Sequence, residues 1–338
     1  MFRLFATIGA FITLLLSGLI FLAVVMGESI ATGWQIKVTS RAREGFWRYE
    51  LIDLDRRLAY PILITQVDRS PPLFSPDGRY GVMNINEPFE VVNLNDDTIV
   101  TQLSGMARIW SPDSRFLAFL DNDPASATFQ AMLILSVDEN GNMGEANPVR
   151  LEGEEALAGS VRWSPDSERM AFLAYNNDGT ELLIADANGS NTRRLVPGIS
   201  LIQQMAWSPD SAQLAFAWFS PQDTAHLILS RINVDGIGQE IISPTPEHRI
   251  ASLEWSPDGE HIAYIASQGG GLFVVNVVSG QITGSIDDGL QASTINWSPD
   301  SERIVFLSSR NSDFYSVHLD GRNIQRLTNT DNINVLMP

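Results

Sequence analysis

One tetrapeptide, Trp-Ser-Pro-Asp, recurs along the chain and constrains its fold more than any other feature. Five copies carry Trp, a sixth carries Phe, and the residue after each Asp is Gly or Ser. The copies are Phe74-Ser75-Pro76-Asp77, Trp110-Ser111-Pro112-Asp113, Trp163-Ser164-Pro165-Asp166, Trp207-Ser208-Pro209-Asp210, Trp255-Ser256-Pro257-Asp258 and Trp297-Ser298-Pro299-Asp300. Successive prolines are 36, 53, 44, 48 and 42 residues apart. A motif that returns at this period indicates an array of similar supersecondary units.

Each copy is typical of a tight turn between two strands. Pro presets the φ angle at the second position of a type I turn, and Ser and Asp side chains bond to nearby backbone groups. Two apolar segments follow each turn, separated by a loop, and a turn such as Asp320-Gly321 comes after them. Asp-Gly and Asn-Gly pairs are strong hairpin signals. With the strand before each Trp, this predicts four antiparallel strands per unit, and four-stranded sheets arranged radially form a β-propeller.

The two ends of the repeat region bear on the number of blades. Residues 34–53 resemble the last unit without its first strand and its Ser-Pro-Asp turn, and residues 332–338 resemble a first strand with nothing after it. Joined, the two segments would complete a seventh blade and remove the edges that an open array exposes. We therefore predict an all-β, seven-bladed propeller over residues 31–338. The alternative is six blades with residues 34–69 as a separate appendage.

Composition limits the classes of partner. The chain has 338 residues, of which 44% are hydrophobic, so it can bury a large core. It carries 22 Lys and Arg against 40 Asp and Glu, a net charge of −18. This balance disfavours nucleic acid or an anionic membrane surface as the main partner. The absence of Cys excludes disulfides and thiolate chemistry.

An uncharged stretch precedes the repeats. From Leu4 to Met26 the sequence holds 23 residues without a charge. As a helix they would span about 34 Å, enough for a bilayer core of about 30 Å. The stretch is longer than the apolar region of a signal peptide, which has about 7–15 residues. Residues 1–30 are therefore predicted to form a single-pass transmembrane anchor.

The charges on the two sides of this stretch favour opposite orientations. Arg3 favours a cytoplasmic amino terminus, whereas Lys37, Arg41 and Arg43 follow the span and favour the reverse. Those three residues fall in or beside predicted strands, and large domains are translocated regardless of such charges. The propeller is therefore expected on the extracytoplasmic side.

The last unit carries the fullest version of the repeat. It runs from Trp297 through Phe306 and Ser309-Arg310 to Asp320-Gly321 and Arg326-Leu327-Thr328. In this order the residues resemble the WD40-like propeller repeat of the TolB family, also found in dipeptidyl-peptidase-IV-like enzymes. The resemblance covers about residues 34–338 and implies the fold, while one fold hosts many functions. The Trp-Asp and Gly-His dipeptides of true WD40 repeats are absent. An uncharged stretch stands where TolB has a further domain, so TolB's partners are not carried over.

The polar residues of the repeat are interpreted as turn residues rather than catalytic groups. Asp77, Asp113, Asp166, Asp210, Asp258 and Asp300 occur once per unit, and turn chemistry accounts for them. The sequence has no Gly-x-Ser-x-Gly nucleophile motif. Residues 138–145 resemble a calcium loop, but Met143 and Val149 stand where Gly and Glu are required. The histidines, which show no ligand spacing, are His226, His248, His261 and His318. We therefore predict no catalytic, cofactor-binding or metal-binding residue.

The remaining candidate for function is a surface. Loops between the first two long strands of each unit should share one face with the connections between units; they span residues 84–88, 121–128, 176–180, 220–225 and 267–271. Arg41, Arg43 and Arg310 form a predicted basic cluster on this face, and Trp218-Phe219 a bulky apolar pair. Arg and aromatic residues are preferred at binding hot spots. These five residues mark a predicted partner-binding face, and packing of Trp218 inside its own unit is the equal alternative.

Two functions from different classes follow. The first is a monomeric, membrane-tethered, non-catalytic propeller that binds a protein or an envelope polymer through one face. The second is an enzyme of lactonase or lyase type with its site in the central channel. The first is favoured because the sequence shows no convergent set of His and carboxylate residues. Acidic residues and a His that converge within metal-binding distance would favour the second.

Deleting residues 331–338 tests closure of the seventh blade. If this segment is the missing first strand, its loss exposes unpaired backbone groups and apolar side chains. The apolar residues of the segment are Ile333, Val335, Leu336 and Met337. Burying one such side chain is worth about 1.5–3 kcal/mol, so we expect a loss of several kcal/mol in unfolding free energy. Terminal deletions are usually harmless, and an unchanged melting temperature would favour six blades.

Overall fold

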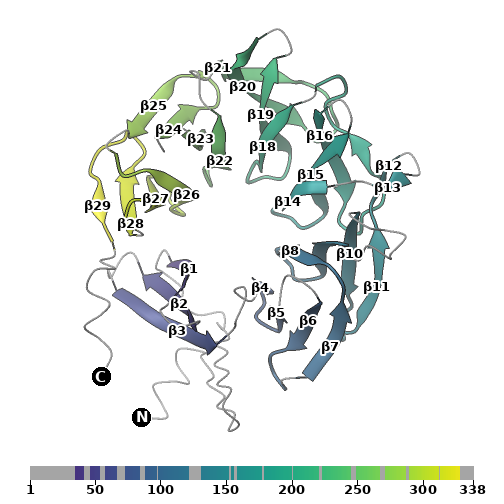
Figure 1. Ribbon diagram of the computed structural model, residues 1–338. Coiled ribbons are helices and arrows are strands. Elements are labelled where there is room, and N and C mark those ends of the chain that lie inside the picture. Colours follow the sequence, from purple (N-terminus) through teal and green to yellow (C-terminus); the bar gives the residue numbers. More distant parts are fainter. Residues whose placement is uncertain are drawn as a thin grey trace. The chain divides into compact units, whose positions relative to one another are not determined.

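The computed structural model describes residues 35–327, except the internal segments 42–45, 54–57, 67–72, 84–87, 97, 122–130, 152–153, 156–157, 177–178, 200, 221–222, 245–248, 267–270, 287–288 and 312. The predicted anchor (residues 1–30) and the predicted closing strand (residues 332–338) lie outside the described residues. Within them, the regular elements are all β-strands (Figure 1). No helix among them is long and apolar enough to cross a membrane.

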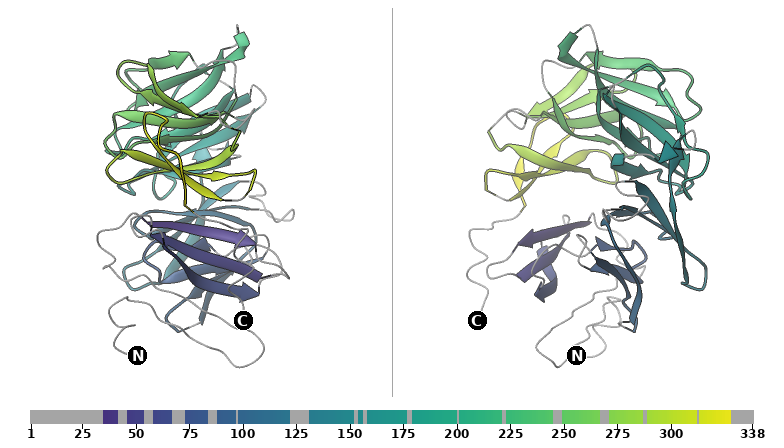
Figure 2. Two further views of the ribbon diagram at one scale, coloured as in Figure 1. Left: turned by 90° about the vertical axis from the view of Figure 1, so that its left-hand side faces the viewer. Right: turned by 45° about the vertical axis from the view of Figure 1, so that its right-hand side comes forward.

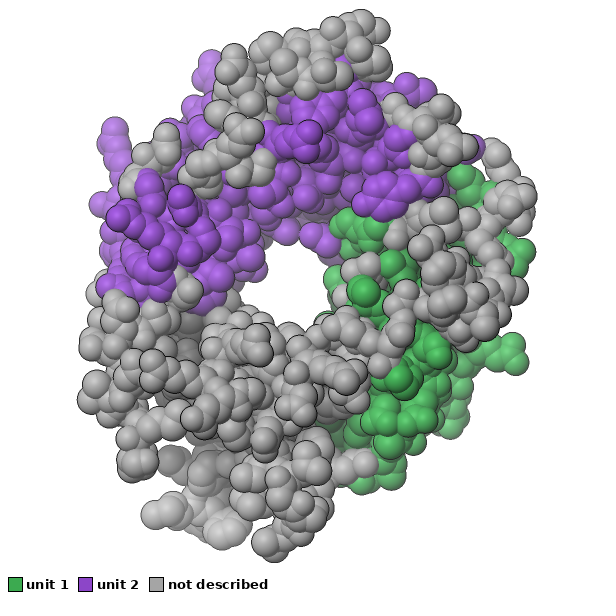
Figure 3. All heavy atoms as spheres, viewed as in Figure 1, with its two compact units in different colours: residues 1–161, 185–192 green, residues 162–184, 193–338 purple. Residues whose placement is uncertain are grey.

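The chain divides into two compact units. Unit 1 comprises residues 1–161 and 185–192, and unit 2 comprises residues 162–184 and 193–338 (Figure 3). One sheet crosses the division: it consists of β14 (Ala158–Trp163), β15 (Arg169–Asn176), β16 (Gly179–Asp186) and β17 (Arg193–Arg194), in that order.

Unit 1 contains two four-stranded sheets and one three-stranded sheet. The three-stranded sheet is β1 (Gln35–Arg41), β2 (Phe46–Asp53) and β3 (Leu58–Gln66). The four-stranded sheets are β4 (Leu73–Phe74), β5 (Tyr80–Met83), β6 (Phe89–Asn93) and β7 (Thr98–Leu103), and β8 (Met106–Trp110), β9 (Phe116–Leu120), β10 (Met132–Val137) and β11 (Met143–Pro148). A short ladder joins β12 (Arg150–Leu151) to β13 (Glu154–Glu155). The order β1-β2-β3 is the one expected for a repeat without its first strand.

The rest of unit 2 consists of three further four-stranded antiparallel sheets. They are β18 (Ile202–Trp207), β19 (Gln213–Ser220), β20 (Asp223–Asn233) and β21 (Glu240–Pro244); β22 (Ile250–Trp255), β23 (His261–Ala266), β24 (Leu272–Asn276) and β25 (Ile282–Ile286); and β26 (Ala292–Trp297), β27 (Arg303–Ser308), β28 (Phe314–His318) and β29 (Gln325–Arg326). The first strands β18, β22 and β26 lie side by side, and the fourth strands lie at the opposite edge (Figures 1 and 2). The predicted four strands per repeat are thus confirmed.

The Ser-Pro-Asp segments form the turns between first and second strands. In the β18–β19 turn, Ser208 Oγ donates to Asp210 Oδ1 at 2.6 Å and accepts from the backbone N–H of Gln213 at 2.8 Å. Asp210 Oδ1 also accepts from the backbone N–H of Ala212 at 3.0 Å. The Ser–Asp bond recurs in all six turns, with distances of 2.7, 2.7, 2.5, 2.6, 2.5 and 2.5 Å in chain order. The motif is therefore a self-contained hydrogen-bonded turn.

These turns also join neighbouring sheets. Ser211, in the left-handed region with φ of 59°, accepts a hydrogen bond on Oγ from the backbone N–H of Asp166 at 3.1 Å. Trp207 Nε1 donates to the carbonyl of Arg162 in the same preceding sheet at 3.1 Å. The same two bonds recur between the last two sheets of unit 2, from Asp258 N to Ser301 Oγ and from Trp297 Nε1 to Glu254 O. In unit 1 they run from Asp77 N to Ser114 Oγ and from Trp110 Nε1 to Leu73 O.

The turns between third and fourth strands pack closely on the preceding sheet. At Gly280, with φ of +68°, an added Cβ would stand 2.0 Å from the carbonyl oxygen of Ile242 on β21. At Gly321, with φ of +81°, it would stand 2.7 Å from the carbonyl oxygen of Ser285 on β25. Only Gly combines this conformation with so close an approach. Apolar side chains fill the space between the sheets, in clusters that include Trp207, Trp255 and Trp297.

Replacing Ser208 by Ala tests the turn. Ser208 is buried, so its loss removes the acceptor of the Gln213 N–H and one of the two hydrogen bonds to Asp210 Oδ1. Losing such bonds costs about 1–3 kcal/mol of unfolding free energy, which urea denaturation at pH 7 would measure. The matched control is Ser279→Ala, at an exposed turn serine, for which we expect a change within about 0.5 kcal/mol.

The same variant should also change how the unfolding free energy depends on pH in acid. The hydrogen bonds from Ser208 and from the Ala212 N–H lower the pKa of Asp210, while burial acts in the opposite direction. A carboxylate with a lowered folded-state pKa stabilises the fold above its unfolded pKa of about 3.9, and this contribution is lost as pH falls through the folded value. As the pH falls below about 4, we expect the unfolding free energy of Ser208→Ala to decrease less than that of the wild type. Parallel acid curves would show that the bond does not set this pKa.

Replacing Tyr264 by Phe should stabilise the protein. Tyr264 is 1% exposed, and its hydroxyl is buried without a hydrogen-bond partner. Burial raises the pKa of this hydroxyl to about 12. The equivalent residues, nine after the motif Trp, are Phe119, Phe172, Phe216 and Phe306. Since the ring stacks on Phe273 with centroids 5.2 Å apart, Phe would keep the packing and remove an unsatisfied hydroxyl.

The expected gain is about 1 kcal/mol, measured by urea denaturation. The matched reverse change, Phe216→Tyr, should destabilise by a similar amount. A loss of stability in Tyr264→Phe would mean that the hydroxyl has a partner in solution, such as a buried water.

Candidate functional site

A hollow of about 740 Å³ opens on unit 2, at the ends of strands that belong to three neighbouring sheets. It is lined by Leu173, Tyr175, Thr180, Leu201, Ile202, Gln203, Gln204, Phe219, Arg249 and Ile250. These residues come from β15, β16, β18 and β19 and from the start of β22. The hollow therefore lies on the side where the sequence predicts a partner-binding face.

Two apolar side chains at the hollow are exposed. Tyr175 is 57% exposed and Leu201 is 38% exposed. Leu201 also holds a left-handed conformation with φ of 65°, which is uncommon for a residue with a Cβ. Its carbonyl accepts a hydrogen bond from the backbone N–H of Phe219 at 3.4 Å. At the equivalent place before β26, Gln291 has φ of 54°, so the backbone is a feature of the repeat and the exposed apolar side chain is particular to this site.

The predicted pair Trp218-Phe219 is half-buried, each ring packs against a buried cluster, and Phe219 also lines the hollow. Trp218 Nε1 donates to Ser230 Oγ at 3.0 Å, and its ring packs against a buried cluster between sheets. Phe219 lines the hollow, with the guanidinium carbon of Arg249 6.0 Å from its ring centroid. The alternative that Trp218 packs within its own unit therefore agrees with its contacts, and Phe219 is the member that a ligand could reach.

The predicted basic cluster stays a prediction. Arg43 lies outside the described residues, and of Arg41 only the backbone, at the end of β1, is described. Arg310 is exposed after β27, and its backbone N–H donates to Ser308 Oγ at 3.3 Å. Arg41 and Arg310 belong to different units. The cation that the structure places at the hollow is instead Arg249, which the sequence analysis did not single out.

A charged pair lies on the first strands of unit 2. Burial raises the pKa of Glu254 on β22, and the charge of Arg162 on β14 acts in the opposite direction. Both residues precede a motif Trp, and their carbonyls accept the indole N–H bonds from the next sheet. Glu254 is thus half-buried beside a cation, an arrangement common to structural pairs and to functional sites.

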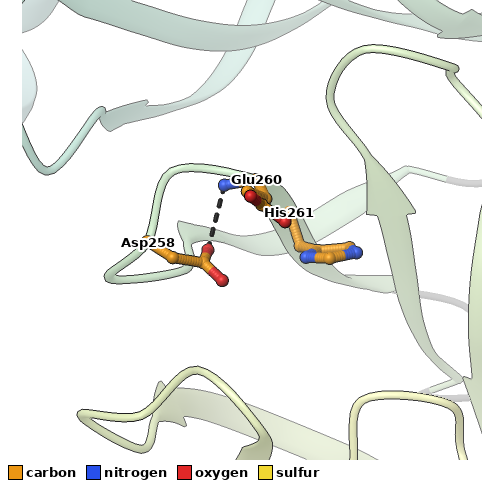
Figure 4. Close-up of side chains that lie close together, drawn as sticks. All are labelled: Asp258, Glu260 and His261. Atoms are coloured by element: carbon orange, nitrogen blue, oxygen red, sulfur yellow. Dashed lines mark hydrogen bonds between the residues drawn. The ribbon is translucent and has the colours of Figure 1, made fainter.

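A second feature lies in the turn between β22 and β23. Asp258, Glu260 and His261 each offer a ligand atom, and the three atoms lie within 4.8 Å of one another. Asp258 Oδ1 accepts from the backbone N–H of Glu260 at 2.9 Å (Figure 4) and from Ser256 Oγ at 2.5 Å. Asp258 and Glu260 are exposed and His261 is half-buried. Two carboxylates and an imidazole are a donor set that divalent transition metals accept.

This group was not predicted from the sequence, because the histidines and the turn aspartates each have a separate interpretation there. The usable signal is the spacing Asp-x-Glu-His after Ser-Pro. A turn folds these residues back on themselves, so side chains two and three positions apart can converge. Helical or CxxC-type spacings are not required in such a turn.

The comparisons with known proteins bear on the family. The model of the lipoprotein LpqB β-propeller domain matches residues 140–337, more than half of the chain. The chain belongs to this family. None of the curated proteins compared with the chain matches it. The LpqB-type assignment agrees with the predicted propeller and covers both candidate sites.

Solved structures show the same fold at low identity. The β-propeller domain of Cps50 (Swd1) from Myceliophteria thermophila has a TM-score of 0.58 at 11% identity, covering 84% of this chain and 99% of that one. An oligogalacturonate lyase in complex with manganese has 0.54 at 17%, covering 78% and 79%. A putative TolB from Agrobacterium tumefaciens has 0.49 at 16%, covering 83% and 88%. At these identities the first two show that the LpqB-type chain shares a propeller fold with proteins of different functions.

Proposed function

We propose that this protein is a non-catalytic β-propeller that binds a segment of a partner protein through the hollow on unit 2. The observation that carries the proposal is the exposed, mixed apolar and polar lining there. Tyr175 and Leu201 are exposed although apolar surface is normally buried. Phe219 and Arg249 add an aromatic ring and a cation, the residue types enriched at hot spots.

The shape and chemistry of the hollow fit a peptide segment. A volume of about 740 Å³ accommodates a few side chains, within the range of about 300–1,000 Å³ for ligand pockets. Gln203 can pair with a backbone amide, while Tyr175 and Leu201 can cover an apolar side chain of the partner. Arg249 favours an acidic or carbonyl group nearby. An envelope polymer is the alternative occupant, and the experiment below separates the two.

The complete fold proposed for this function has seven blades. The sheet β1-β2-β3 has the strand order of a repeat that lacks its first strand. A strand from residues 332–338 would supply it and join the two ends of the domain. Such closure supports a binding role because a closed ring holds its loops on one rigid framework.

The proposed location is the outer side of a cell membrane. The family model is named for a lipoprotein, and this sequence has no Cys, so a lipid on a cysteine thiol is not available to it. The uncharged stretch from Leu4 to Met26 is the feature that would hold the propeller at the membrane instead. The alternative enzymatic function, of lyase or lactonase type, is not favoured, since the lyase resembles this chain at the level of fold alone.

Site-specific crosslinking tests the proposal. A photoreactive phenylalanine analogue at Tyr175, in the full chain and in its native membrane, should give a discrete adduct with one partner. Phe219→Ala and Arg249→Ala should each reduce the yield several-fold, because both residues line the hollow. The control position is Glu302, where we expect no adduct. Glu302 is exposed in the turn before the second strand β27, and such turns lie at the end of the strands opposite to the hollow.

The outcomes are distinguishable. A discrete adduct that trypsin digests identifies a protein partner, whereas a polydisperse adduct that resists trypsin identifies a polymer. Equal adducts at Tyr175 and Glu302, or a yield unaffected by Phe219→Ala and Arg249→Ala, would contradict binding through the hollow. Circular dichroism of each variant checks that the fold is retained.

A further inference from the structure

The turn between β22 and β23 differs from its sister turns in charge. Among the six Ser-Pro-Asp turns, the residues two and three positions after Asp are Arg79-Tyr80, Arg115-Phe116, Glu168-Arg169, Ala212-Gln213, Glu260-His261 and Glu302-Arg303. Four turns thus carry an Arg beside the carboxylates and one is neutral at both positions. The β22–β23 turn alone combines two carboxylates with an imidazole, and their ligand atoms lie within 4.8 Å of one another.

Two buried groups beside this turn lack partners. The Nδ1 atom of His261 is buried and makes no hydrogen bond. Trp255 is 8% exposed, and its Nε1 also makes no hydrogen bond, although Trp207 and Trp297 each donate to a carbonyl of the preceding sheet. Buried polar atoms in native proteins are nearly always satisfied, and exceptions call for an explanation such as an ion or a water.

A cleft gives access to the same place. It has a volume of about 440 Å³ and is lined by Ser208, Pro209, Asp210, Gln213, Arg231, Trp255, Pro257, Asp258 and Gly259. Here the serine that joins other neighbouring turns is replaced by Gly259. Arg231 is held at the cleft by Glu240, with Nη2 2.6 Å from Oε2, so this cation is already paired. The cleft leaves room for water or a ligand atom beside Asp258.

We propose that Asp258, Glu260 and His261 bind a divalent transition-metal ion of the Zn²⁺ class. Asp258 Oδ1 is engaged in the turn, and Oδ2 is the oxygen available to an ion. The Asp258 and Glu260 carboxylates neutralise the ion, and a neutral imidazole of His261 supplies nitrogen. Bound Zn²⁺ holds its ligand atoms at about 2.0–2.2 Å, which the exposed Glu260 side chain reaches by changing rotamer.

Of the three proposed ligands, Asp258 lines the cleft. Three protein ligands leave a fourth position for water or an oxygen of a ligand, as in open zinc sites. Trp255 lines the cleft beside Asp258, and its buried Nε1 is a donor without a partner. The site is separate from the hollow that carries the proposed partner binding, so the two proposals stand or fall independently.

The sister turns provide matched controls within one chain. In the turn before β27, Asp300 and Glu302 are followed by Arg303. The Arg303 guanidinium offers no ligand atom and offsets one carboxylate charge, so this turn lacks a third ligand. Arg303→His should therefore create a second site, and His261→Gln should remove the first. Gln is tolerated at this position, because Gln213 occupies it in the β18–β19 turn.

The experiment is a calorimetric titration of the full chain in detergent with Zn²⁺ alone, with Mg²⁺ and Ca²⁺ as comparison ions. We expect one Zn²⁺ per chain, at least tenfold weaker binding in His261→Gln and Glu260→Gln, and two Zn²⁺ per chain in Arg303→His. His318→Gln is the control for adventitious binding, since His318 lies beside Asp320 at 3.1 Å, and it should leave the affinity unchanged.

Co²⁺ provides a second readout, because its visible absorption spectrum reports imidazole ligation and should change in His261→Gln. Zn²⁺ binding that is unchanged in His261→Gln, or lost in His318→Gln, would overturn the proposal. So would equal affinity for Mg²⁺, which prefers all-oxygen sites. Circular dichroism and melting temperature without metal confirm that each variant is folded.

Discussion

The hydrogen bond from the motif serine to the motif aspartate underlies the rest of this structure. It closes each turn between first and second strands at 2.5–2.7 Å, and the same Ser Oγ accepts a backbone N–H five residues on. Both bonds are made within the turn, so the turn geometry does not depend on contacts with neighbouring sheets. The backbone N–H of Asp is then left pointing outward, and the next turn's serine can accept it.

Repetition of this contact joins neighbouring sheets at the end of the strands that holds the turns between first and second strands, and the Gly turns, which lie at the same end, add a second contact. Gly280 and Gly321 approach the backbone of the preceding sheet so closely that a Cβ would collide with it. Along the strands the packing is apolar, with a Trp of each first strand at the boundary. The loops between second and third strands and the connections between sheets lie at the opposite end, outside these contacts, and are free to vary. This is where the hollow lies.

The two candidate sites occur where one repeat has residues that differ from those at the same positions in the other repeats. Leu201 places an apolar side chain on a backbone conformation that Gln291 occupies elsewhere. His261 stands where two of the sister turns carry Arg, and Gly259 stands where four of the turns carry a serine. A repeat protein can accept such changes locally, since each unit contacts mainly its neighbours. Departures from the repeat are therefore a useful guide to function in a fold that otherwise serves many.

The sequence by itself determined the turn chemistry, the four strands per repeat and the membership of a propeller family. These depend on residues close in the chain, such as Ser208 and Asp210, whose spacing is enough to define the turn. Tertiary structure decided what depends on neighbouring units. That Phe219 lines a hollow while Trp218 does not follows from how neighbouring sheets pack, and Arg249 reaches Phe219 only through that packing. The approach of Asp258, Glu260 and His261 needed the folded turn, because side-chain direction in a turn is not given by residue spacing.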